Sequence, residues 1–286
     1  MTEINRTEYG KYGACVEITD GVRSMLVTTD IGPRVIFFGM KGGANIMFED
    51  KNDDINKSGE FFDKNLPGKG GWHIYGGHRL WKSPEYMDTY YPDNAPVAVE
   101  TLSDGAVFTS EPELTTKLQK SVKITMADDG TVTLEHKITN TGKEKTGKIA
   151  LWALTVMDKG AKGEFRLSSA DTGFLPNRNL VFWPYSDLTD DRFFTDGKKV
   201  TLDWKDRPPF KLGARVDAGK LVIRTKGLVF TKRFGCVDGA EYPDMQCNAE
   251  LYTNELMFEV ESLSPYTELA PGESAVHTEV WTLDKE

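Results

Sequence analysis

Two stretches in the middle of the chain, QKSVKITMA at 119–127 and TVTLEHKIT at 131–139, decide the fold. In each of them apolar and polar residues alternate, which is the two-residue period of a β-strand with one buried face. Asp128-Asp129-Gly130 lies between the two stretches and is typical of a tight hairpin turn. The segment therefore predicts an antiparallel pair of strands.

Similar short strands are expected throughout the chain. We expect them at 14–18, 24–28, 34–38, 45–48, 149–157, 220–224, 227–231, 249–253, 256–262 and 275–283. The stretch 149–157 is almost wholly apolar, which favours a strand that is covered on both faces. Pro and Gly interrupt the segments that might form a helix of three turns. The pattern predicts an all-β fold, a sandwich or a barrel, which we interpret as one large domain over residues 1–286.

Composition narrows the class of protein. The 286 residues carry a formal net charge of −9 and no basic patch, so we expect neither a nucleic-acid partner nor an anionic membrane surface. No apolar run is long enough for a membrane span, and Met1–Lys11 is too polar for a signal sequence. Cys15, Cys236 and Cys247 form no CxxC motif, so no cysteine-based metal site is expected. These features predict a cytoplasmic protein with reduced thiols and no cofactor.

The densest group of chemically capable residues is the segment GWHIYGGHRLWKSPE at 71–85. Its glycines allow unusual backbone angles and close approach to a ligand. Its candidate ligand-binding side chains are Trp72, His73, His78, Arg79, Trp81 and Glu85. Indole faces together with planar polar groups suit a sugar ring and its hydroxyls. The alternative is a structural loop whose histidines satisfy backbone groups.

A metal is the other chemistry that this segment allows. His73, His78 and Glu85 are ligand types that bind zinc, but the two histidines lack the spacing of a helical zinc motif. We therefore predict no metal site here.

A late strand supplies a candidate general base. In Phe258-Glu259-Val260-Glu261, alternation puts both glutamates on one face and turns Phe258 and Val260 toward the core. A glutamate that reaches a pocket can take a proton from a substrate hydroxyl. The alternative is that this face is simply exposed to solvent.

Other candidates are weaker. The stretch 182–187 contains Trp183 and Tyr185, which would line a groove or pack in the core. Lys232-Arg233 follows a β-strand pattern; such a pair is typical of solvated surface, but Arg233 is a candidate for binding a carboxylate or phosphate. His136 lies on the apolar face of its strand and is expected to be a hydrogen-bonded core histidine.

Several of these stretches, in order along most of the chain, carry a family resemblance. Gly76–Trp81 with Pro84-Glu85 resembles a signature of uncharacterised bacterial proteins in the galactose mutarotase-like, or aldose 1-epimerase-like, superfamily. Further matching stretches are 183–187, 191–192, 258–265, 269–274 and 277–281. The resemblance implies a large antiparallel β-sandwich, a supersandwich, with a sugar-binding groove on one sheet.

The resemblance also implies a chemistry. Aldose 1-epimerases interconvert sugar anomers with a glutamate as base at the anomeric hydroxyl and a histidine as acid at the ring oxygen. The base matches Glu261 or, two residues earlier, Glu259, and the sequence that follows favours Glu261. The mid-chain strand that carries the acid matches Ala150–Thr155, which holds Trp152 and no histidine.

These observations lead to two hypotheses for a protein whose partner is a small carbohydrate. In the first, the protein is aldose 1-epimerase-like, with Glu261 as base, His78 or His73 as acid and Arg79 orienting the sugar. Trp81 and Trp152 would stack on the ring, and Trp72, Glu85, Glu259 and Arg233 are further candidate binding residues. In the alternative, the protein binds a sugar, or serves carbohydrate metabolism as an accessory, without turnover.

Overall fold

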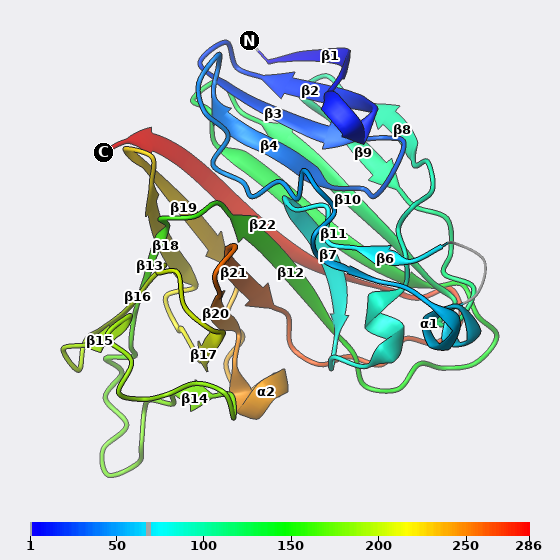
Figure 1. Cartoon of the computed structure of the whole chain (residues 1–286). Helices are drawn as coiled ribbons and strands as arrows, with labels where there is room; N and C mark the ends of the chain where they lie inside the picture. Colours follow the sequence, from blue (N-terminus) through cyan, green and yellow to red (C-terminus); the bar gives the residue numbers. More distant parts are fainter. Residues whose placement is uncertain (1, 67–69) are drawn as a thin grey trace.

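The computed structural model describes residues 2–66 and 70–286, which form two large antiparallel sheets that face each other (Figure 1). The first sheet contains, in spatial order, β1 (Glu3–Glu8), β2 (Ala14–Thr19), β3 (Arg23–Thr28), β4 (Val35–Met40), β7 (His78–Ser83), β12 (Ala150–Met157), β21 (Phe258–Leu263), β20 (Ala249–Thr253), β17 (Phe210–Ala214) and β14 (Val181–Phe182). The predicted all-β sandwich is confirmed.

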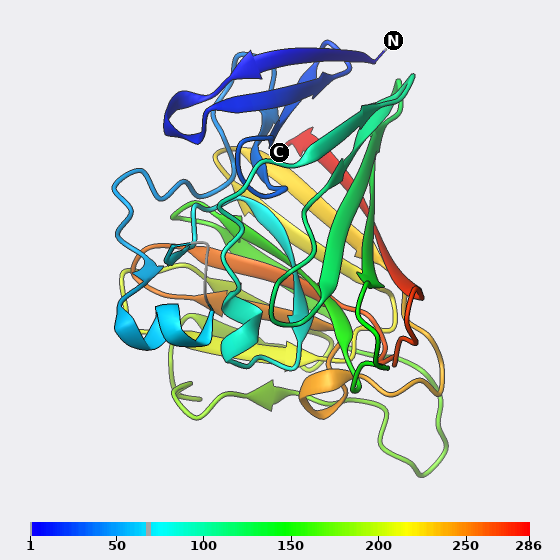
Figure 2. The same cartoon turned by 90° about the vertical axis from the view of Figure 1, so that its right-hand side faces the viewer.

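The second sheet packs against the first, as the turned view in Figure 2 shows. It contains, in spatial order, β15 (Phe193–Thr195), β16 (Lys199–Asp203), β13 (Lys162–Arg166), β18 (Lys220–Thr225), β19 (Leu228–Phe234), β22 (Ser274–Lys285), β11 (Val132–Asn140), β10 (Leu118–Met126), β9 (Gly105–Thr109) and β8 (Ala98–Thr101). The predicted hairpin is β10–β11, in which Met126 pairs with Val132 across the turn at Asp128–Gly130.

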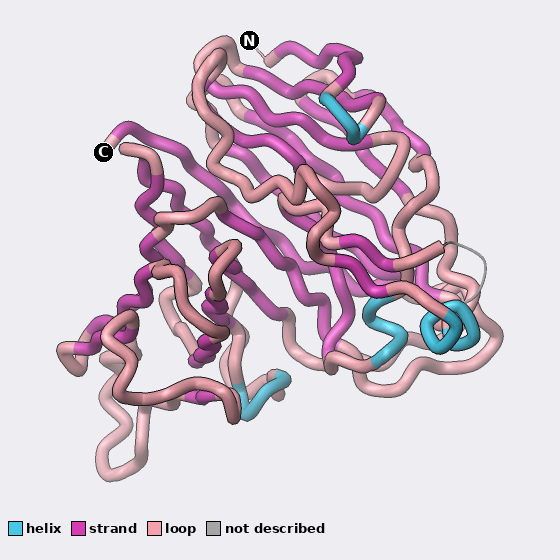
Figure 3. The backbone as a smooth tube through the Cα atoms, viewed as in Figure 1, coloured by secondary structure: helices cyan, strands magenta, loops and turns pink. Residues whose placement is uncertain are grey.

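Helices are short and lie outside the sheets (Figure 3). The remaining elements are η1 (Gly10–Tyr12), β5 (Asn56–Lys57), α1 (Glu60–Asn65), β6 (Trp72–His73), η2 (Met87–Tyr90) and α2 (Pro243–Gln246). β5 and β6 pair as a small separate sheet. Among the described residues, no helix has the length and apolar character needed to cross a membrane.

The main core fills the space between the two sheets. Ile124 and Leu134, from the apolar faces of β10 and β11, are fully buried there. Phe38 of the first sheet and Phe230 and Trp281 of the second pack ring against ring. Burial of each such side chain stabilises the fold by about 1.5–3 kcal/mol. The alternating pattern of the strands is therefore explained by a core on one side of each sheet.

The first sheet is also covered on part of its other side. All eight residues of β12 are buried. Trp152 and Leu154 of this strand belong to a second apolar cluster with Trp72 of β6 and Trp81 of β7. This explains why 149–157 is a continuous apolar run, since both faces of β12 are covered.

Candidate functional site

Strand alternation gathers charged residues and indoles on one face of the first sheet. Phe258 and Val260 point into the core between the sheets, so Glu259 and Glu261 point away from it. The pairing of neighbouring strands places residues of β7, β12, β20 and β17 on the same face of the sheet. Its members, which we call the site face, are Arg79, Trp81, Trp152, Lys211, Glu250, Glu259 and Glu261.

Glu261 lies at the centre of this face and is fully buried. The indole Nε1 of Trp152 donates a hydrogen bond of 2.7 Å to its Oε2, and Lys211 Nζ donates to the same oxygen at 3.0 Å. Lys211 Nζ also lies 2.7 Å from Oε2 of Glu250, an ion-pair distance. Glu250 stands directly opposite Glu261 on the neighbouring strand. Two buried carboxyl groups therefore share one ammonium.

Arg79 and Glu259 form a second charged pair beside this group. Arg79 Nη2 lies 3.5 Å from Glu259 Oε1, and both side chains are almost fully buried. The guanidinium lies over the ring of Trp81, 4.2 Å from its centroid, which is a cation–π distance. Trp81 in turn packs edge to face on Trp152. The indoles of Trp81 and Trp152 thus pack beside the charged groups of the site face and restrict the position of Arg79.

Burial changes the proton affinities of these groups. Removal from water, partly offset by Arg79 and reinforced by the charge of Glu261, raises the pKa of Glu259 to about 7. Burial raises the pKa of Glu250 well above its usual value, although Lys211 opposes this. Burial alone would lower the pKa of Lys211, but Glu250 and Glu261 outweigh it and raise that pKa. The site face therefore contains a cation that keeps its charge, Lys211, and a carboxyl group that titrates near neutral pH, Glu259.

Several buried polar atoms around the site face have no hydrogen-bond partner within the described part of the chain. They are Oε1 of Glu250, Oε1 of Glu261, Nε and Nη1 of Arg79 and Nε1 of Trp72. Leaving such a group unsatisfied costs about 1–3 kcal/mol. Acceptors and donors left in this state next to one another are what a hydroxyl-rich ligand would satisfy.

A pocket lies beside β7, and residues of both sheets line it. β4 pairs with β7 only at Val35 and His78, so the rest of that edge of β7 is free of β4. The pocket beside this edge is lined by Arg79 and Trp81 of the site face together with His78, Val122 and His136.

The proton held by Glu259 gives a testable dependence of stability on pH. Because its pKa is higher in the folded chain than the ordinary value of 4.5, protonation stabilises the fold fully below pH 4.5, and this stability is lost as pH rises through about 7. Glu259→Gln has a neutral side chain of the same size. We expect its free energy of unfolding to fall less between pH 5 and pH 8 than that of the wild type, by on the order of 1–3 kcal/mol in urea unfolding.

A matched control is Glu255→Gln, an exposed glutamate in the turn between β20 and β21, which should keep the wild-type dependence. Equal pH slopes for the wild type and Glu259→Gln would show that Glu259 is already ionised at pH 5.

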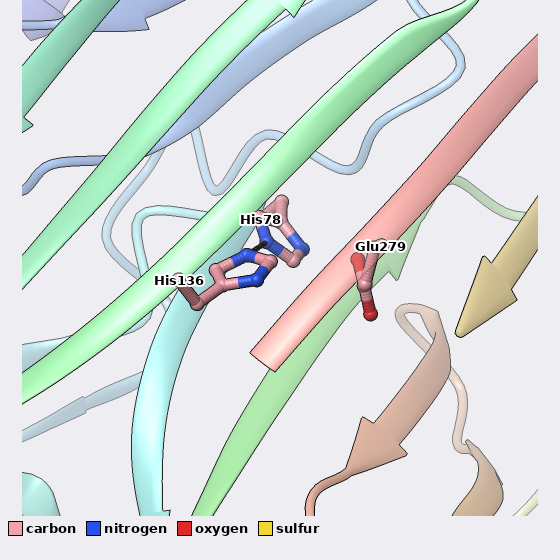
Figure 4. A group of neighbouring side chains, drawn as sticks. All are labelled: His78, His136 and Glu279. Carbon is pink, nitrogen blue, oxygen red and sulfur yellow. Dashed lines mark hydrogen bonds between the residues drawn. The ribbon is translucent and has the colours of Figure 1, made fainter. Parts of the chain in front are cut away.

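His78 lies on the opposite side of β7, between the sheets. Its Nε2 is 2.7 Å from Nε2 of His136. Figure 4 shows the two rings next to each other. His136 Nδ1 donates to the carbonyl oxygen of His277, so its Nε2 accepts from His78, and His78 Nδ1 accepts from the hydroxyl of Thr155. Burial is the largest cause that lowers the pKa of both rings, so both are neutral. His136 is the hydrogen-bonded core histidine that its sequence position predicts.

The same network continues to a buried ion pair. Lys232 Nζ lies 2.9 Å from Glu279 Oε1 and donates to the carbonyl oxygens of Val260 and Ala153. Glu279 Oε2 accepts from the indole of Trp281. The network joins strands of both sheets, so its role is structural.

His78, His136 and Glu279 are also a possible set of metal ligands, since their ligand atoms lie within 4.8 Å of one another (Figure 4). Each of the three already has hydrogen-bond partners, and the ammonium of Lys232 is bound to the carboxylate. A divalent ion would have to lie beside that ammonium and replace these hydrogen bonds, which is costly. The hydrogen-bonded network explains these residues without a metal.

The structure brings together only part of the set of candidates named from the sequence. Arg79, Trp81, Trp152, Glu259 and Glu261 share the site face, and Trp72 packs on Trp81. Three others have different neighbours. His73 Nδ1 is 2.6 Å from Asp53 on the β5–β6 side, Glu85 is exposed and accepts from Tyr90, and Arg233 is exposed on β19 of the second sheet.

The geometry therefore does not support His73 or His78 as the acid that works with Glu261. His78 is on the wrong face of its strand, and His73 is held by Asp53.

Sequence reasoning missed two charged residues of the site face, Lys211 and Glu250. Each is a charged residue flanked by apolar ones within a short β pattern, FKLGA and AELYT. A charge at an alternate position of an otherwise buried strand is the signal that could have found them. Their meeting depends on the order β21–β20–β17 in the sheet, which no local pattern reveals.

The fold is shared with solved structures at low sequence identity. A galactose mutarotase-like protein from Clostridium acetobutylicum has a TM-score of 0.57 and 11% identity, over 100% of this chain and 99% of that chain. A protein from Escherichia coli K12 with the provisional name aldose 1-epimerase has a TM-score of 0.54 and 11% identity, over 100% of both chains. No family model and no curated protein sequence matches the chain.

A third similar structure is part of a longer protein. A TPR-domain containing protein from Parabacteroides distasonis has a TM-score of 0.62 and 15% identity over 96% of this chain, which spans 47% of that protein. The molecule is thus an antiparallel β-sandwich with a charged, indole-lined face. Its architecture is the galactose mutarotase-like fold, so the superfamily resemblance seen in the sequence is confirmed at the level of the fold.

Proposed function

We propose that the chain binds a carbohydrate on the site face and interconverts its anomers. The observation that carries this proposal is the group of buried, unpartnered donors and acceptors on Arg79, Glu250 and Glu261 beside the indoles of Trp81 and Trp152. The names of the similar structures point to the same class of ligand.

The binding part of the proposal follows from sugar chemistry. Hydroxyl groups both donate and accept, so they can satisfy the free guanidinium N–H groups of Arg79 and the free oxygen of Glu261. The C–H face of a sugar ring is apolar and suits an indole. Trp183, whose ring lies 4.6 Å from Lys211 Nζ, is a further indole at the β17 end of the face.

The catalytic part assigns two carboxyl groups to opposite roles. Trp152 and Lys211 stabilise Glu261 as a carboxylate through Oε2, and Oε1 is left to take the proton of the anomeric hydroxyl. Glu259, two residues away on the same face, holds its proton near neutral pH and is the acid. Two residues of a strand span about 6.6 Å, enough for a hemiacetal between the two groups.

In this reaction Glu261 removes the hydroxyl proton from O1 while Glu259 protonates the ring oxygen. The bond from C1 to the ring oxygen breaks, and C1 becomes an aldehyde. Rotation about C1–C2 and the reverse proton transfers close the other anomer, so both glutamates return to their starting states.

A second candidate is binding without turnover. It is favoured by the complete burial of Glu261 and by Trp152, which occupies the mid-chain strand where the resemblance implies a histidine. In that case Arg79 and the indoles recognise the sugar, and Glu261 only accepts hydrogen bonds.

The deciding experiment is a mutarotation assay. Freshly dissolved α-glucose, α-galactose and other aldoses are followed by polarimetry or proton NMR, with spontaneous equilibration as the blank, and binding of the same sugars is measured by calorimetry. Acceleration of any aldose supports the epimerase. Binding without acceleration supports the second candidate, and neither binding nor acceleration across the panel contradicts both.

Trp81 tests the binding part separately. Trp81→Ala removes the indole that packs on both Arg79 and Trp152, so we expect sugar affinity to fall about tenfold to a hundredfold in calorimetry. Trp204→Ala is the control, because this half-buried indole packs against the core on the side of the second sheet. An unchanged affinity in Trp81→Ala would place the sugar elsewhere.

A further inference from the structure

The carboxyl groups of Glu261, Glu250 and Asp244 lie in a row, and the proposed reaction uses only Glu261. Glu261 and Glu250 face each other across β21 and β20, where opposed side chains have Cβ atoms about 5 Å apart. Both are fully buried, and Lys211 is the cation between them. If both were ionised, this buried group would carry an excess negative charge.

The hydrogen bonds of the pair indicate where a proton is held. Lys211 and Trp152 donate to Oε2 of Glu261, and the Lys211 ammonium also lies 2.7 Å from Oε2 of Glu250. The Oε1 atom of each glutamate has no donor within the described residues. Two acceptor-only carboxylates cannot bond to each other, but a carboxylic acid can donate to a carboxylate. One proton on Glu250 would therefore satisfy an oxygen of each group, in agreement with the raised pKa of Glu250.

Asp244 continues the row toward solvent. Its carboxyl group is close enough to Glu250 for each to raise or lower the pKa of the other, and it is only partly buried. It lies on α2, where Asp244, Met245 and Gln246 have φ values of 50°, 60° and 76°. Residues with side chains rarely adopt this left-handed conformation, and three in succession require support from their surroundings.

We propose that Glu250 stores a proton beside Glu261 and that Asp244 exchanges this proton with water. The role of this proton in turnover rests on the proposed function, whereas the presence of the proton on Glu250 does not. When Glu261 has taken a proton from a sugar, Glu250 passes its own proton to Asp244 and receives the one from Glu261. Asp244 then releases one proton to water. Before the ring closes, Asp244 takes one proton back from water and the same transfers run in reverse, so Glu261 can return a proton to O1 and the row ends with the protons it began with.

The titratable groups around this row come from every neighbouring element. Glu250 faces Lys211 of β17, Glu261 of β21, Asp244 of α2 and Cys247, which follows α2. Asp244 is also close enough to be affected by Glu85 and Tyr266. Lys211 is the only cation in this group of described residues. The net charge of the group therefore depends on how many of its carboxyl groups are protonated.

Infrared spectroscopy tests the stored proton without any activity. The carbonyl stretch of protonated carboxyl groups is recorded at about pH 9, where Glu259 is mostly ionised. We expect one such band in the wild type and in Glu259→Gln, and its loss in Glu250→Gln. Glu241→Gln, an exposed glutamate just before α2, is the control and should keep the band. Absence of the band in the wild type, or its persistence in Glu250→Gln, overturns the proposal.

Asp244→Asn tests the exchange step. We expect the stored-proton band to remain in this variant, while kcat for mutarotation falls about tenfold at low buffer concentration and recovers when formate is added. A purely structural role of Asp244 would give a loss that formate does not rescue, and that result overturns the exchange role. If no aldose is turned over by the wild type, the proposed function fails, and the infrared result still decides whether Glu250 holds the proton.

Discussion

Glu261→Gln is expected to lower kcat for mutarotation by a factor of about 10² to 10⁴ while leaving sugar affinity within about threefold of the wild type. Glutamine keeps the size and the hydrogen bond from Trp152 but cannot take the proton of the anomeric hydroxyl. The fold should survive, because Lys211 keeps Glu250 as a partner at 2.7 Å, and loss of the negative charge at 261 favours ionisation of Glu250.

The measurement is polarimetry of the variant, the wild type and Glu255→Gln, each over a range of sugar concentrations, so that kcat and KM are separated. Glu255→Gln should match the wild type. A Glu261→Gln variant with wild-type kcat would remove Glu261 from the chemistry, and attention would then move to Glu259. A variant with normal kcat but strongly raised KM would make Glu261 a binding residue.

The general architecture was readable from the sequence because it depends on local periodicity. Alternation in 119–127 and 131–139 predicted a hairpin, and the structure has it as β10 and β11. The continuous apolar run at 149–157 predicted a strand covered on both faces, and every residue of β12 is buried. Alternation also placed Glu259 and Glu261 together, opposite Phe258 and Val260.

The site was less readable because it depends on which strands are neighbours. Lys211 and Glu261 are 50 residues apart in sequence and meet only because β20 lies between β17 and β21 in the sheet. His78 and Arg79 are adjacent in sequence, but alternation sends the imidazole into the interior and the guanidinium to the site face. The polar segment 71–85 therefore suggested a single site, whereas the structure divides its residues between the interior and the site face.

Lys232 is the clearest case in which a local pattern misled. Lys232-Arg233 reads as a solvated charged pair, and Arg233 is indeed exposed, but the Lys232 side chain is fully buried. Its partner Glu279 lies on β22, which the sequence places 47 residues later. The same register that buries Lys232 puts it directly beneath the backbone of β12 and β21, the two strands that carry Trp152 and Glu261.

Lys232→Met is accordingly expected to lower the free energy of unfolding by about 3–5 kcal/mol, because it leaves the Glu279 carboxylate buried without its counter-charge. The carbonyl oxygens of Ala153 and Val260 lose a donor in the same variant, which adds to the loss. Urea unfolding at pH 7 measures the effect. Lys123→Met is the matched control, since Lys123 is exposed on β10 of the same sheet and should change stability by less than about 0.5 kcal/mol.

The double variant Lys232→Met, Glu279→Gln separates the charge from the packing. With no buried charge left, about half or more of the lost stability should return, because replacing both members of a buried ion pair is often nearly neutral. If the double variant is no more stable than Lys232→Met alone, the loss comes from the carbonyl groups of β12 and β21 rather than from Glu279. The ammonium would then act mainly by holding these two strands in register beneath the site face.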